Sequence, residues 1–525
     1  MAYGIDLGTT NSCVAGWNDK MNTPRFLVNQ VDGSTTTPSV VFFDPNDNNR
    51  ILVGGPALAS FMSNPSRVVR GIKRRIGDAT SYDPRQSGLP NGTDPAAISA
   101  LILKKMAQDV KRGYQQDVQD VVITVPAHFG LEQRAKTKLA GEYAGLRVLE
   151  LIPEPTAAAL SYGIDLNEDK NLIVYDLGGG TFDVTFVRIV NNGESHTFNY
   201  IALDGDARLG GMDWDRRLAQ IFLNKYNTQT GRNYSLKEEK DLTDDSEEAK
   251  LTATLLHEAE RYKKMLSQVD RINWSISFGG NVVDGTITLD EFNQCTRDLL
   301  DRTLELTQKV INMANDSGFN DPDEIILVGG STRMAQVSNA LKERFKKNPL
   351  LHEPDFAVAL GASIYANNPD KYTNDTTRII GTSPISNILS KTYGIITSTG
   401  DIANIIFRNE HLPIDKIVRR FAIAANNQHQ IELNVYESDL LESKDNLTIS
   451  ADQIDNTCKQ VAKCLIDFNQ QFAQGTPITM YIKANNEQLI NIDVDVQGNR
   501  QSTRIKFSIE ENPEMRQYIG GATVV

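Results

Sequence analysis

Short apolar runs separated by glycine-rich turns dominate the first part of the sequence. The runs NLIVYDL at 171–177 and FDVTFVRIV at 182–190 have the β-branched character of buried strands, and three glycines lie between them. The N-terminus repeats this plan, because AYGIDL and SCVAGW flank the turn GTTN at 8–11. The pattern therefore predicts two similar hairpins, with glycine supplying the turn conformations.

From about residue 393 the pattern changes to short strands with turn residues between them. In QIELNVYE, for example, Ile431, Leu433 and Val435 alternate with polar residues and share one face. The predicted strands lie in TYGIITS, IANIIFRN, KIVRRFAIAA, QIELNVYE, ITMYIKANN, LINIDVDVQG and STRIKFSIE. This arrangement is typical of an antiparallel β-sandwich.

Two segments depart from the strand pattern. Residues 371–392 are polar, with serines, threonines, one glycine and one proline, and we interpret them as a linker. Residues 451–475 have helical spacing of their apolar positions, although part of the segment can still form a strand. These positions are Ile454, Cys458, Val461, Leu465, Phe468 and Phe472.

Composition narrows the class of protein. The chain has 525 residues, 40% hydrophobic and 23% charged, which is typical of a soluble protein with several domains. No run of 18 apolar residues and no basic leader is present, so we expect neither a membrane span nor secretion. The four cysteines suggest neither a disulfide framework nor a zinc site, so we expect a cytoplasmic location. A net charge of −13 argues against nucleic acid as a partner.

Each predicted hairpin has an aspartate before its turn and threonine within the turn. Backbone amides and threonine hydroxyls can bind an anion, and a neighbouring carboxylate can hold Mg²⁺ through its water ligands. Asp6 and Asp176 are the candidate metal-binding residues, and hairpin capping is the alternative role for both. Because the design occurs twice, we predict duplicated halves that hold one polyphosphate from both sides.

A series of motifs resembles the seventy-kilodalton heat-shock chaperones of the DnaK type, within the actin-like ATPase superfamily. The motifs are GIDLGTTNSCVA, STTTPSVV, IKRRIG, VVITVPAHF, EPTAAALSYG, DLGGGTFDV, LGGMDWDRRL and EIILVGGSTRMAQV. The resemblance implies an α/β actin-like ATPase domain of two pseudo-symmetric lobes at 1–370, a linker at 371–392 and an all-β sandwich at 393–525. Nothing up to residue 525 matches the family's helical lid, so we expect a lidless peptide groove.

The resemblance also implies hydrolysis of ATP to ADP and phosphate with Mg²⁺. Lys73 would lie near the γ-phosphate, Glu154 would orient water, and Asp176 and Thr181 complete the implied catalytic set. Without the resemblance, Lys73 could be a surface lysine in a basic run, and Glu154 could simply cap a helix. The implied nucleotide-binding residues are Gly8, Thr9, Thr10, Asn11, Gly178, Gly179, Gly180, Gly210, Gly211, Glu260, Lys263, Ser267, Gly329, Gly330, Ser331, Arg333 and Asp355.

Within this set, Glu260, Lys263 and Ser267 recur at i, i+3 and i+7 and share one helical face. A solvated ion pair is an equal alternative when the resemblance is set aside. Met212 stands where the family often has an acidic residue, which would change the nucleotide contacts slightly.

The resemblance further implies that the C-terminal sandwich binds extended, unfolded polypeptides. The implied peptide-binding residues are Ile395, Ser398, Phe421, Ala424, Ile431 and Leu433. The alternative is that the apolar members of this set are ordinary core residues. Pro126 and Arg134 would relay the nucleotide state between the domains. The linker lacks the family's leucine-rich pattern, with IIGTSPISNIL as the nearest candidate.

The leading interpretation is an ATP-dependent molecular chaperone, with a J-domain co-chaperone and a nucleotide-exchange factor as implied partners. The altered linker, Ser398 and the absent lid favour a second interpretation, a nucleotide-binding adaptor that grips one dedicated protein partner. A small-molecule kinase of the same superfamily is a third, but no acceptor pocket with a general-base aspartate is apparent in the sequence.

Overall fold

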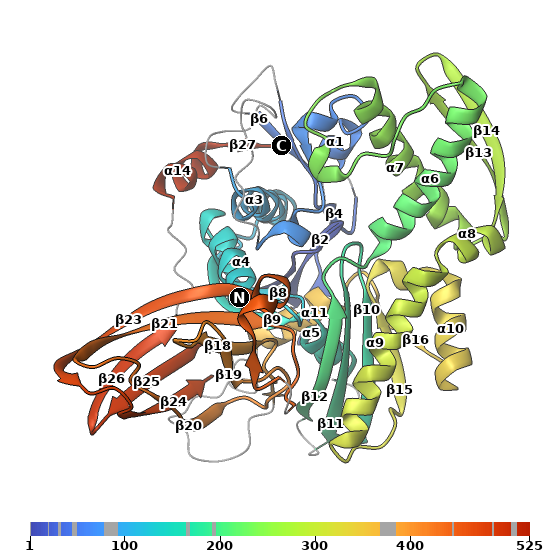
Figure 1. Cartoon of the computed structure of the whole chain (residues 1–525). Coiled ribbons are helices and arrows are strands. Elements are labelled where there is room, and N and C mark those ends of the chain that lie inside the picture. The colour runs from blue at the N-terminus through green and yellow to red at the C-terminus, as the bar shows by residue number, and fades with distance from the viewer. Residues whose placement is uncertain are drawn as a thin grey trace.

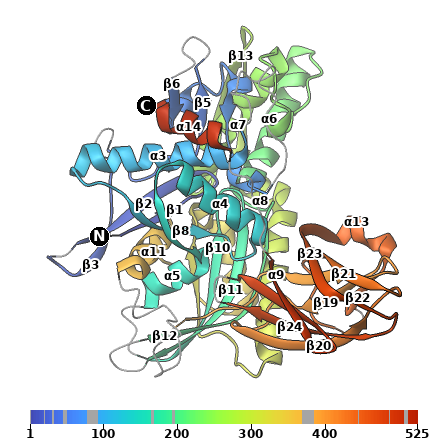
Figure 2. The ribbon, with the colours of Figure 1, turned by 90° about the vertical axis from the view of Figure 1, so that its left-hand side faces the viewer.

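The computed structural model describes residues 2–18, 20–29, 33–44, 50–77, 93–163, 168–191, 196–367, 385–443, 446–485, 488–505 and 512–525. An α/β part built from the first two thirds of the chain lies beside a C-terminal part made mainly of strands (Figure 1). The same two parts are seen side by side after a rotation by 90° (Figure 2).

Two six-stranded sheets form the centre of the α/β part. The first has the order β3 (Thr23–Phe26), β2 (Asn11–Asn18), β1 (Tyr3–Asp6), β8 (Asp120–Val125) and β9 (Arg147–Pro153), with β4 (Thr37–Pro38) paired to β2. The second has the order β16 (Leu350–Leu351), β15 (Glu324–Val328), β10 (Lys170–Leu177), β11 (Phe182–Asn191), β12 (His196–Asp206) and β17 (Ile385–Ser386).

Both sheets repeat one local plan. In the first, β1 pairs antiparallel with β2 and parallel with β8. In the second, β10 pairs antiparallel with β11 and parallel with β15. The two hairpins predicted from the sequence are therefore confirmed, and we call β1–β2 the N-terminal hairpin and β10–β11 the central hairpin.

Helices α5 (Glu154–Gly163) and α11 (Ala357–Asn367) join the two sheets. Their buried alanines belong to one hydrophobic cluster that also contains residues of β8, β9, β10 and β11. Ala157, Ala158 and Ala159 are fully buried, and Gly361 lies against the backbone of Ala157. Small side chains at these positions allow the helices to approach closely, which brings the ends of both hairpins together.

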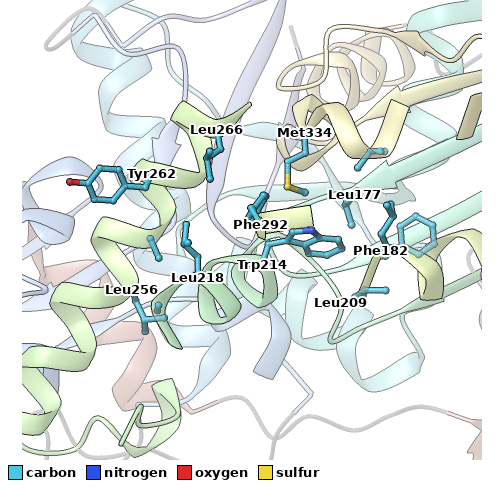
Figure 3. Packing of buried hydrophobic residues seen from close by; sticks show 14 of the residues in the cluster. Leu177, Phe182, Leu209, Trp214, Leu218, Leu256, Tyr262, Leu266, Phe292 and Met334 are labelled. Atoms are coloured by element: carbon cyan, nitrogen blue, oxygen red, sulfur yellow. The ribbon is translucent and has the colours of Figure 1, made fainter. Parts of the chain in front are cut away.

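The other helices of the α/β part are α1 (Gly55–Ala59), α3 (Pro95–Tyr114), α4 (Leu131–Tyr143), α6 (Gly211–Thr230), α7 (Glu247–Leu266), α8 (Leu289–Cys295), α9 (Arg297–Asp316) and α10 (Ala335–Phe345). Trp214 of α6 is fully buried and packs in one cluster with Leu177 and Phe182 of the central hairpin (Figure 3). This packing fixes the start of α6 beside the central glycine turn. None of the described helices is long and apolar enough to cross a membrane.

Two smaller sheets complete the α/β part. One is the hairpin of β13 (Arg271–Phe278) and β14 (Asn281–Thr288). The other has the order β27 (Thr523–Val524), β6 (Arg50–Val53), β5 (Val41–Phe43) and β7 (Val68–Val69).

The C-terminal part contains a five-stranded and a four-stranded sheet, which we call the C-terminal sheets. The first has the order β22 (Thr448–Ile449), β19 (Ile402–Ile406), β18 (Thr392–Ile396), β21 (Gln428–Ser438) and β23 (Cys458–Phe472). The second has the order β20 (Ile414–Ala422), β24 (Pro477–Ala484), β25 (Ile490–Val496) and β26 (Asn499–Ile505). All seven predicted strands are confirmed, and both sheets contribute to one hydrophobic cluster.

The helical interpretation of residues 451–475 is wrong for most of the segment. Only Ile454–Thr457 is an α-helix (α13), and Cys458–Phe472 is the long strand β23. The pairing of β21 with β23 shifts register twice, and four residues of β23 lie between Phe472 and Asp467, the next paired position. These irregularities break the alternation of apolar residues along β23, so their spacing imitated a helix.

Part of the predicted linker adds to the second sheet. Residues 371–384 lie outside the described residues, but β17, within the segment IIGTSPISNIL, pairs parallel with β12 through Phe198 and Asn199. Leu389 is then fully buried, and its amide donates to the carbonyl of Glu410. The chain therefore enters the C-terminal sheets along the edge of the α/β part.

The sequence analysis assigned residues 393–525 to one all-β unit, but the end of that range contacts the α/β part. Helix α14 (Pro513–Gly521) buries Met515 and Ile519 in the cluster around α3. Strand β27 extends the sheet of β6, and the amide of Val525 donates to the carbonyl of Ile51. The last residues thus return across the molecule to the α/β part.

Candidate functional site

The turns of the two hairpins face each other at close range. A Cβ atom at Gly179 would overlap the hydroxyl of Thr10, and one at Gly180 would overlap the side chain of Thr9. The glycines of one turn are therefore required by the threonines of the other. Gly179 and Gly180 thus leave room for the threonine side chains of the opposite turn.

A cavity of about 650 Å³ lies between these turns, a size typical of small-molecule sites. Its wall includes Asp6, Gly8, Thr9, Thr10, Asn11, Lys73, Glu154, Asp176, Gly178, Gly179, Thr181, Gly211, Glu260, Lys263, Ser267, Gly329, Gly330, Ser331, Arg333 and Asp355. Two predicted residues, Gly180 and Gly210, are not part of the wall. They support it from behind, because Gly210 packs against the backbone of Gly180.

Lys73 and Glu154 form a buried ion pair at the cavity. The surface interpretation of Lys73 is therefore wrong. Burial, together with the charges of Asp6 and Asp183, raises the pKa of Glu154 to about 7 despite the opposing charge of Lys73. Burial would lower the pKa of the Lys73 ammonium, but Glu154, Asp6 and Asp176 raise it. The lysine is thus held charged while the glutamate can exchange a proton near neutral pH.

Asp6 and Asp176 end β1 and β10 at the same cavity. Burial raises the pKa of both carboxyls, and neighbouring carboxylates raise that of Asp176 further. Thr124 donates a hydrogen bond to Asp6 at 3.2 Å. Buried carboxylates around a single lysine leave negative charge that a cation would neutralise.

The carboxylates of Asp6 and Asp176 fit Mg²⁺ better than they fit a metal ion whose ligands all come from the protein. Among the described residues, no group of three or more His, Cys, Asp and Glu side chains is placed to hold a metal ion. Mg²⁺ commonly keeps several waters and binds one or two carboxylates together with phosphate oxygens. Asp6 and Asp176 match that mode.

At the opposite end of the cavity, charged side chains of α6 and α7 form hydrogen bonds and ion pairs. Lys263 Nζ donates to the carbonyl of Gly211 at 2.9 Å and contacts Asp215 Oδ1 at 2.7 Å. Burial would raise the pKa of Glu260, but Lys264, Arg70 and Lys263 lower it to about 2. The solvated-pair interpretation of the helical spacing is therefore wrong for Lys263, which is 8% exposed.

Across the cavity, the loop after β15 supplies the other wall of this end. Arg333 contacts Asp355 at 2.5 Å, and its guanidinium is half-exposed at the cavity. Ser331 Oγ donates to the carbonyl of Gly178 at 2.9 Å. This bond ties the loop to the central glycine turn, so the two ends of the cavity are held together.

Sequence reasoning missed several residues of the site. Asp183 stands directly opposite Asp176 in the central hairpin, as Cys13 stands opposite Asp6 in the N-terminal hairpin. The signal for Asp183 was the second aspartate of DLGGGTFD, which the antiparallel register brings back to the first. Asp215 had no local signal, because its partner Lys263 is far away in the sequence.

The predicted relay residues lie at the two ends of the loop that joins β8 to α4. Pro126 is buried at the end of β8, and Arg134 of α4 donates through Nε to the carbonyl of Phe129 at 3.1 Å. Burial lowers the pKa of Arg134 to about 10. The two residues are joined through Phe129 rather than by direct contact.

The predicted peptide-binding residues divide between the core of the C-terminal sheets and their surface. Ile395, Ile431 and Leu433 are buried in the core of the C-terminal sheets, and Phe421 packs against it. The exposed members of the set, Ser398 and Ala424, are polar or small. The core interpretation of the apolar residues therefore describes this structure.

The chain matches the sequence model of a known protein family. The sequence model of the family described as Hsp70 protein matches residues 2–463. The match includes both hairpins, every residue of the predicted nucleotide set and strands β18 to β22 of the C-terminal sheets.

Proposed function

The chain belongs to the Hsp70 family, and from this premise we propose that it hydrolyses ATP in the cavity between the two hairpins and acts as an ATP-dependent molecular chaperone. Members of this family are generally ATPases that bind ATP or ADP with Mg²⁺. The observation that carries the proposal is the meeting of two phosphate-binding turns beside the buried Lys73–Glu154 pair.

The turns would bind the phosphates from both sides. Backbone amides at 9–11, at Gly179 and at Thr181, with the hydroxyls of Thr9, Thr10 and Thr181, would supply hydrogen-bond donors to an anion. Lys73 adds a positive charge to the same wall. Such fixed donors stabilise the charge that develops on a transferred phosphoryl group without rearranging during the reaction.

Glu154 would orient the attacking water and accept its proton. Its raised pKa of about 7 keeps it ionised at slightly alkaline pH yet basic enough to take a proton. Asp6 and Asp176 would hold Mg²⁺ through water, and bound Mg²⁺ supplies charge neutralisation at the phosphates.

The sheet arrangement supports the finer domain assignment. The repeated plan of the two six-stranded sheets supports two pseudo-symmetric lobes. The shared hydrophobic cluster of the C-terminal sheets supports a β-sandwich. We further propose that this sandwich binds extended apolar segments of unfolded proteins, which are the general ligands of the family.

The test is release of phosphate from ATP with Mg²⁺ and without any other acceptor. Lys73→Ala and Glu154→Ala should each lower the rate by about 100-fold or more. Lys138→Ala, which removes an exposed lysine of α4, should leave the rate unchanged. Rates near wild type in the first two variants would contradict the assignment, and a rate that requires an added acceptor would favour a kinase.

A second candidate is the nucleotide-binding adaptor with a dedicated partner. It is favoured by the burial of Ile395, Ile431 and Leu433, because side chains within the core are not available to bind a peptide. A peptide array separates the two functions, because a chaperone binds many apolar sequences and an adaptor binds few or none. Stimulation of the ATPase by an apolar peptide would favour the chaperone.

A further inference from the structure

His128 lies on the loop that joins β8 to α4 and is 5% exposed. Its Nδ1 lies 2.9 Å from Oδ1 of Asp183, which is itself 1% exposed. A carboxylate only accepts hydrogen bonds, so the imidazole donates from Nδ1. Among the described residues, neither Nε2 of His128 nor Oδ2 of Asp183 has a hydrogen-bond partner.

Asp183 therefore depends on His128 for its described hydrogen bond. The dependence matters because Asp176 and Asp183 are direct register partners across the central hairpin, with their side chains on one face. Like charges placed directly opposite each other repel, and burial strengthens that repulsion. The hydrogen bond from His128 opposes the rotation of Asp183 away from the cluster.

Asp183 acts on the candidate site through its charge. It is not part of the cavity wall, but its charge raises the pKa of Glu154, together with burial and Asp6. A change in the position of this carboxylate would therefore alter Glu154 without changing the phosphate-binding turns.

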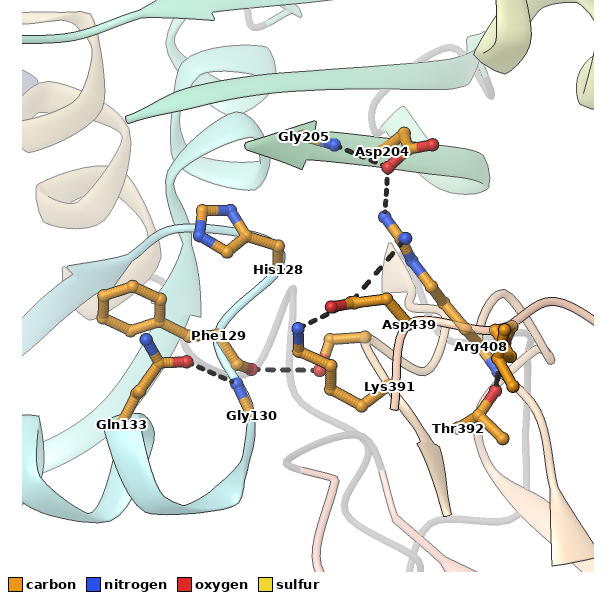
Figure 4. Close-up of polar contacts among 12 residues, drawn as sticks. His128, Phe129, Gly130, Gln133, Asp204, Gly205, Lys391, Thr392, Arg408 and Asp439 are labelled. Carbon is orange, nitrogen blue, oxygen red and sulfur yellow. Dashed lines mark hydrogen bonds and ion pairs between the residues drawn. The ribbon is translucent and has the colours of Figure 1, made fainter. Parts of the chain in front are cut away.

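The backbone that carries His128 is also held by the C-terminal part (Figure 4). The carbonyl of Phe129 accepts a hydrogen bond from Ser390 Oγ at 3.0 Å. Gly130 lies so close to Glu437 of β21 that a Cβ atom at Gly130 would overlap its carboxylate. The His128 ring lines a cavity of about 510 Å³ whose other walls include Asp204, Lys391, Arg408 and Asp439.

We propose that His128 is a positioning residue of the ATPase site: it fixes the Asp183 carboxylate beside the buried cluster, and Ser390 fixes the loop that carries it. The inference rests on the proposed ATP hydrolysis. It assigns to the loop between β8 and α4 a chemical link from the C-terminal part to the cavity, made of Ser390, Phe129, His128 and Asp183.

The test compares His128→Asn with His128→Leu. The amide of asparagine can donate to Asp183 from nearly the position of Nδ1, whereas leucine fills space without a donor. We expect His128→Leu to lower kcat by about 10- to 100-fold with little change in nucleotide Kd, and His128→Asn to restore most of kcat. His352→Leu, which removes the hydrogen bond between the residue after β16 and Ser161 of α5, serves as the control and should keep the wild-type kcat.

Equal losses in His128→Asn and His128→Leu would show a packing role only and overturn the inference. Nitrogen NMR of the imidazole provides a readout independent of ATP hydrolysis. Wild type should show a protonated Nδ1, and Asp183→Asn should change that signal. A protein without ATPase activity would refute the proposed function, while an Nδ1 without a proton would refute the His128–Asp183 bond.

Discussion

At the residue scale, burial decides what Glu154 can do. Water is removed from its carboxyl while carboxylates surround it, so its pKa rises from 4.5 to about 7. The opposing charge of Lys73 is too small to reverse this shift. The residue therefore changes its protonation state within the physiological pH range, as a general base should.

The pKa of Glu154 predicts how ATP hydrolysis depends on pH. Because Glu154 acts in its ionised form, kcat/KM for ATP should rise as the pH increases through about 7. Glu154→Gln should remove both the activity and this dependence. A wild-type kcat/KM that stays flat from about pH 6 to about pH 8 would contradict the role of Glu154.

The raised pKa of Glu154 also predicts how the stability of the folded protein depends on pH. The folded state binds the Glu154 proton more tightly than the unfolded state, so stability from this group is present below pH 4.5 and is lost as the pH rises to about 7. Glu154→Gln should therefore raise Tm above that of wild type near pH 8 and change it little near pH 4. Thermal unfolding followed by circular dichroism checks this, and an equal shift at both pH values would refute it.

Glycine substitutions test the close approach of the two turns. Gly180→Ala should weaken nucleotide binding by about tenfold or more, because Thr9 must move, and overpacking should lower the free energy of unfolding by about 1–3 kcal/mol. Gly520→Ala is the control, since no atom lies near its Cβ position, and it should stabilise α14 by up to about 1 kcal/mol. Calorimetry that finds wild-type affinity for Gly180→Ala would contradict the interlocked turns.

Much of the cavity wall was predictable from short motifs, because each motif keeps its residues within one turn or helix end. Asp183 and His128 were not predicted, since their bond joins residues 55 positions apart. The buried state of Lys73 was also not apparent from its basic neighbours in the sequence. Short sequence motifs show which residues can take part in a site. Which distant residue each one contacts becomes apparent only from the packing of helices and strands.

At the element scale, strands were predicted where alternation was regular and missed where it was not. The strand β21 alternates strictly and was found, but its partner β23 contains register shifts. A helix and a bulged strand can both place apolar residues three or four positions apart. Only the pairing with β21 decides between them.

The contact between β12 and the C-terminal sheets gives a prediction at this scale. Arg408 is 5% exposed and donates to Asp204 Oδ1 at 2.8 Å and to the carbonyl of Leu203 at 3.3 Å. Arg408→Ala leaves buried Asp204 with Lys309 and the Gly205 amide as its partners, and should lower the free energy of unfolding by about 3–5 kcal/mol.

The matched control for this contact is Arg500→Ala. Arg500 pairs with Asp493 on the exposed face of the C-terminal sheets, and such pairs contribute about 0–1 kcal/mol. Urea denaturation should therefore separate the two variants clearly. Equal midpoints for both would show that the Arg408 contact does not hold the two parts together.

The return of α14 and β27 to the α/β part gives another prediction. Ile519 is 1% exposed, and Lys104 Nζ donates to the carbonyls of Ile519, Gly520 and Ala522. Ile519→Asp should detach this segment and remove the bond from the Val53 amide to the Val525 carbonyl.

Hydrogen exchange of β6 measures that detachment. Ile519→Asp should raise the exchange rate at Val53, whereas Gln517→Asp, on the exposed face of α14, should not. Nucleotide affinity should be the same in both variants. Unchanged exchange in Ile519→Asp would show that the end of the chain does not protect this strand.

At the scale of the whole molecule, two hairpins from distant parts of the chain meet to form one cavity. The sequence predicted this meeting because the design DLG with threonine occurs twice. It did not predict how the C-terminal sheets contact the loop at 126–130, because that contact depends on surface shape and on single charges such as Arg408. The repeated motif can be found in the sequence, whereas the contact between the C-terminal sheets and the α/β part can be found only in the folded structure.

The most direct measurement is a crystal structure of the protein with Mg²⁺ and a non-hydrolysable ATP analogue. We predict the triphosphate between residues 8–11 and 178–181, the metal beside Asp6 and Asp176, and the base between α7 and Arg333. A nucleotide bound elsewhere, or a cavity that stays empty at saturating nucleotide, would contradict the account.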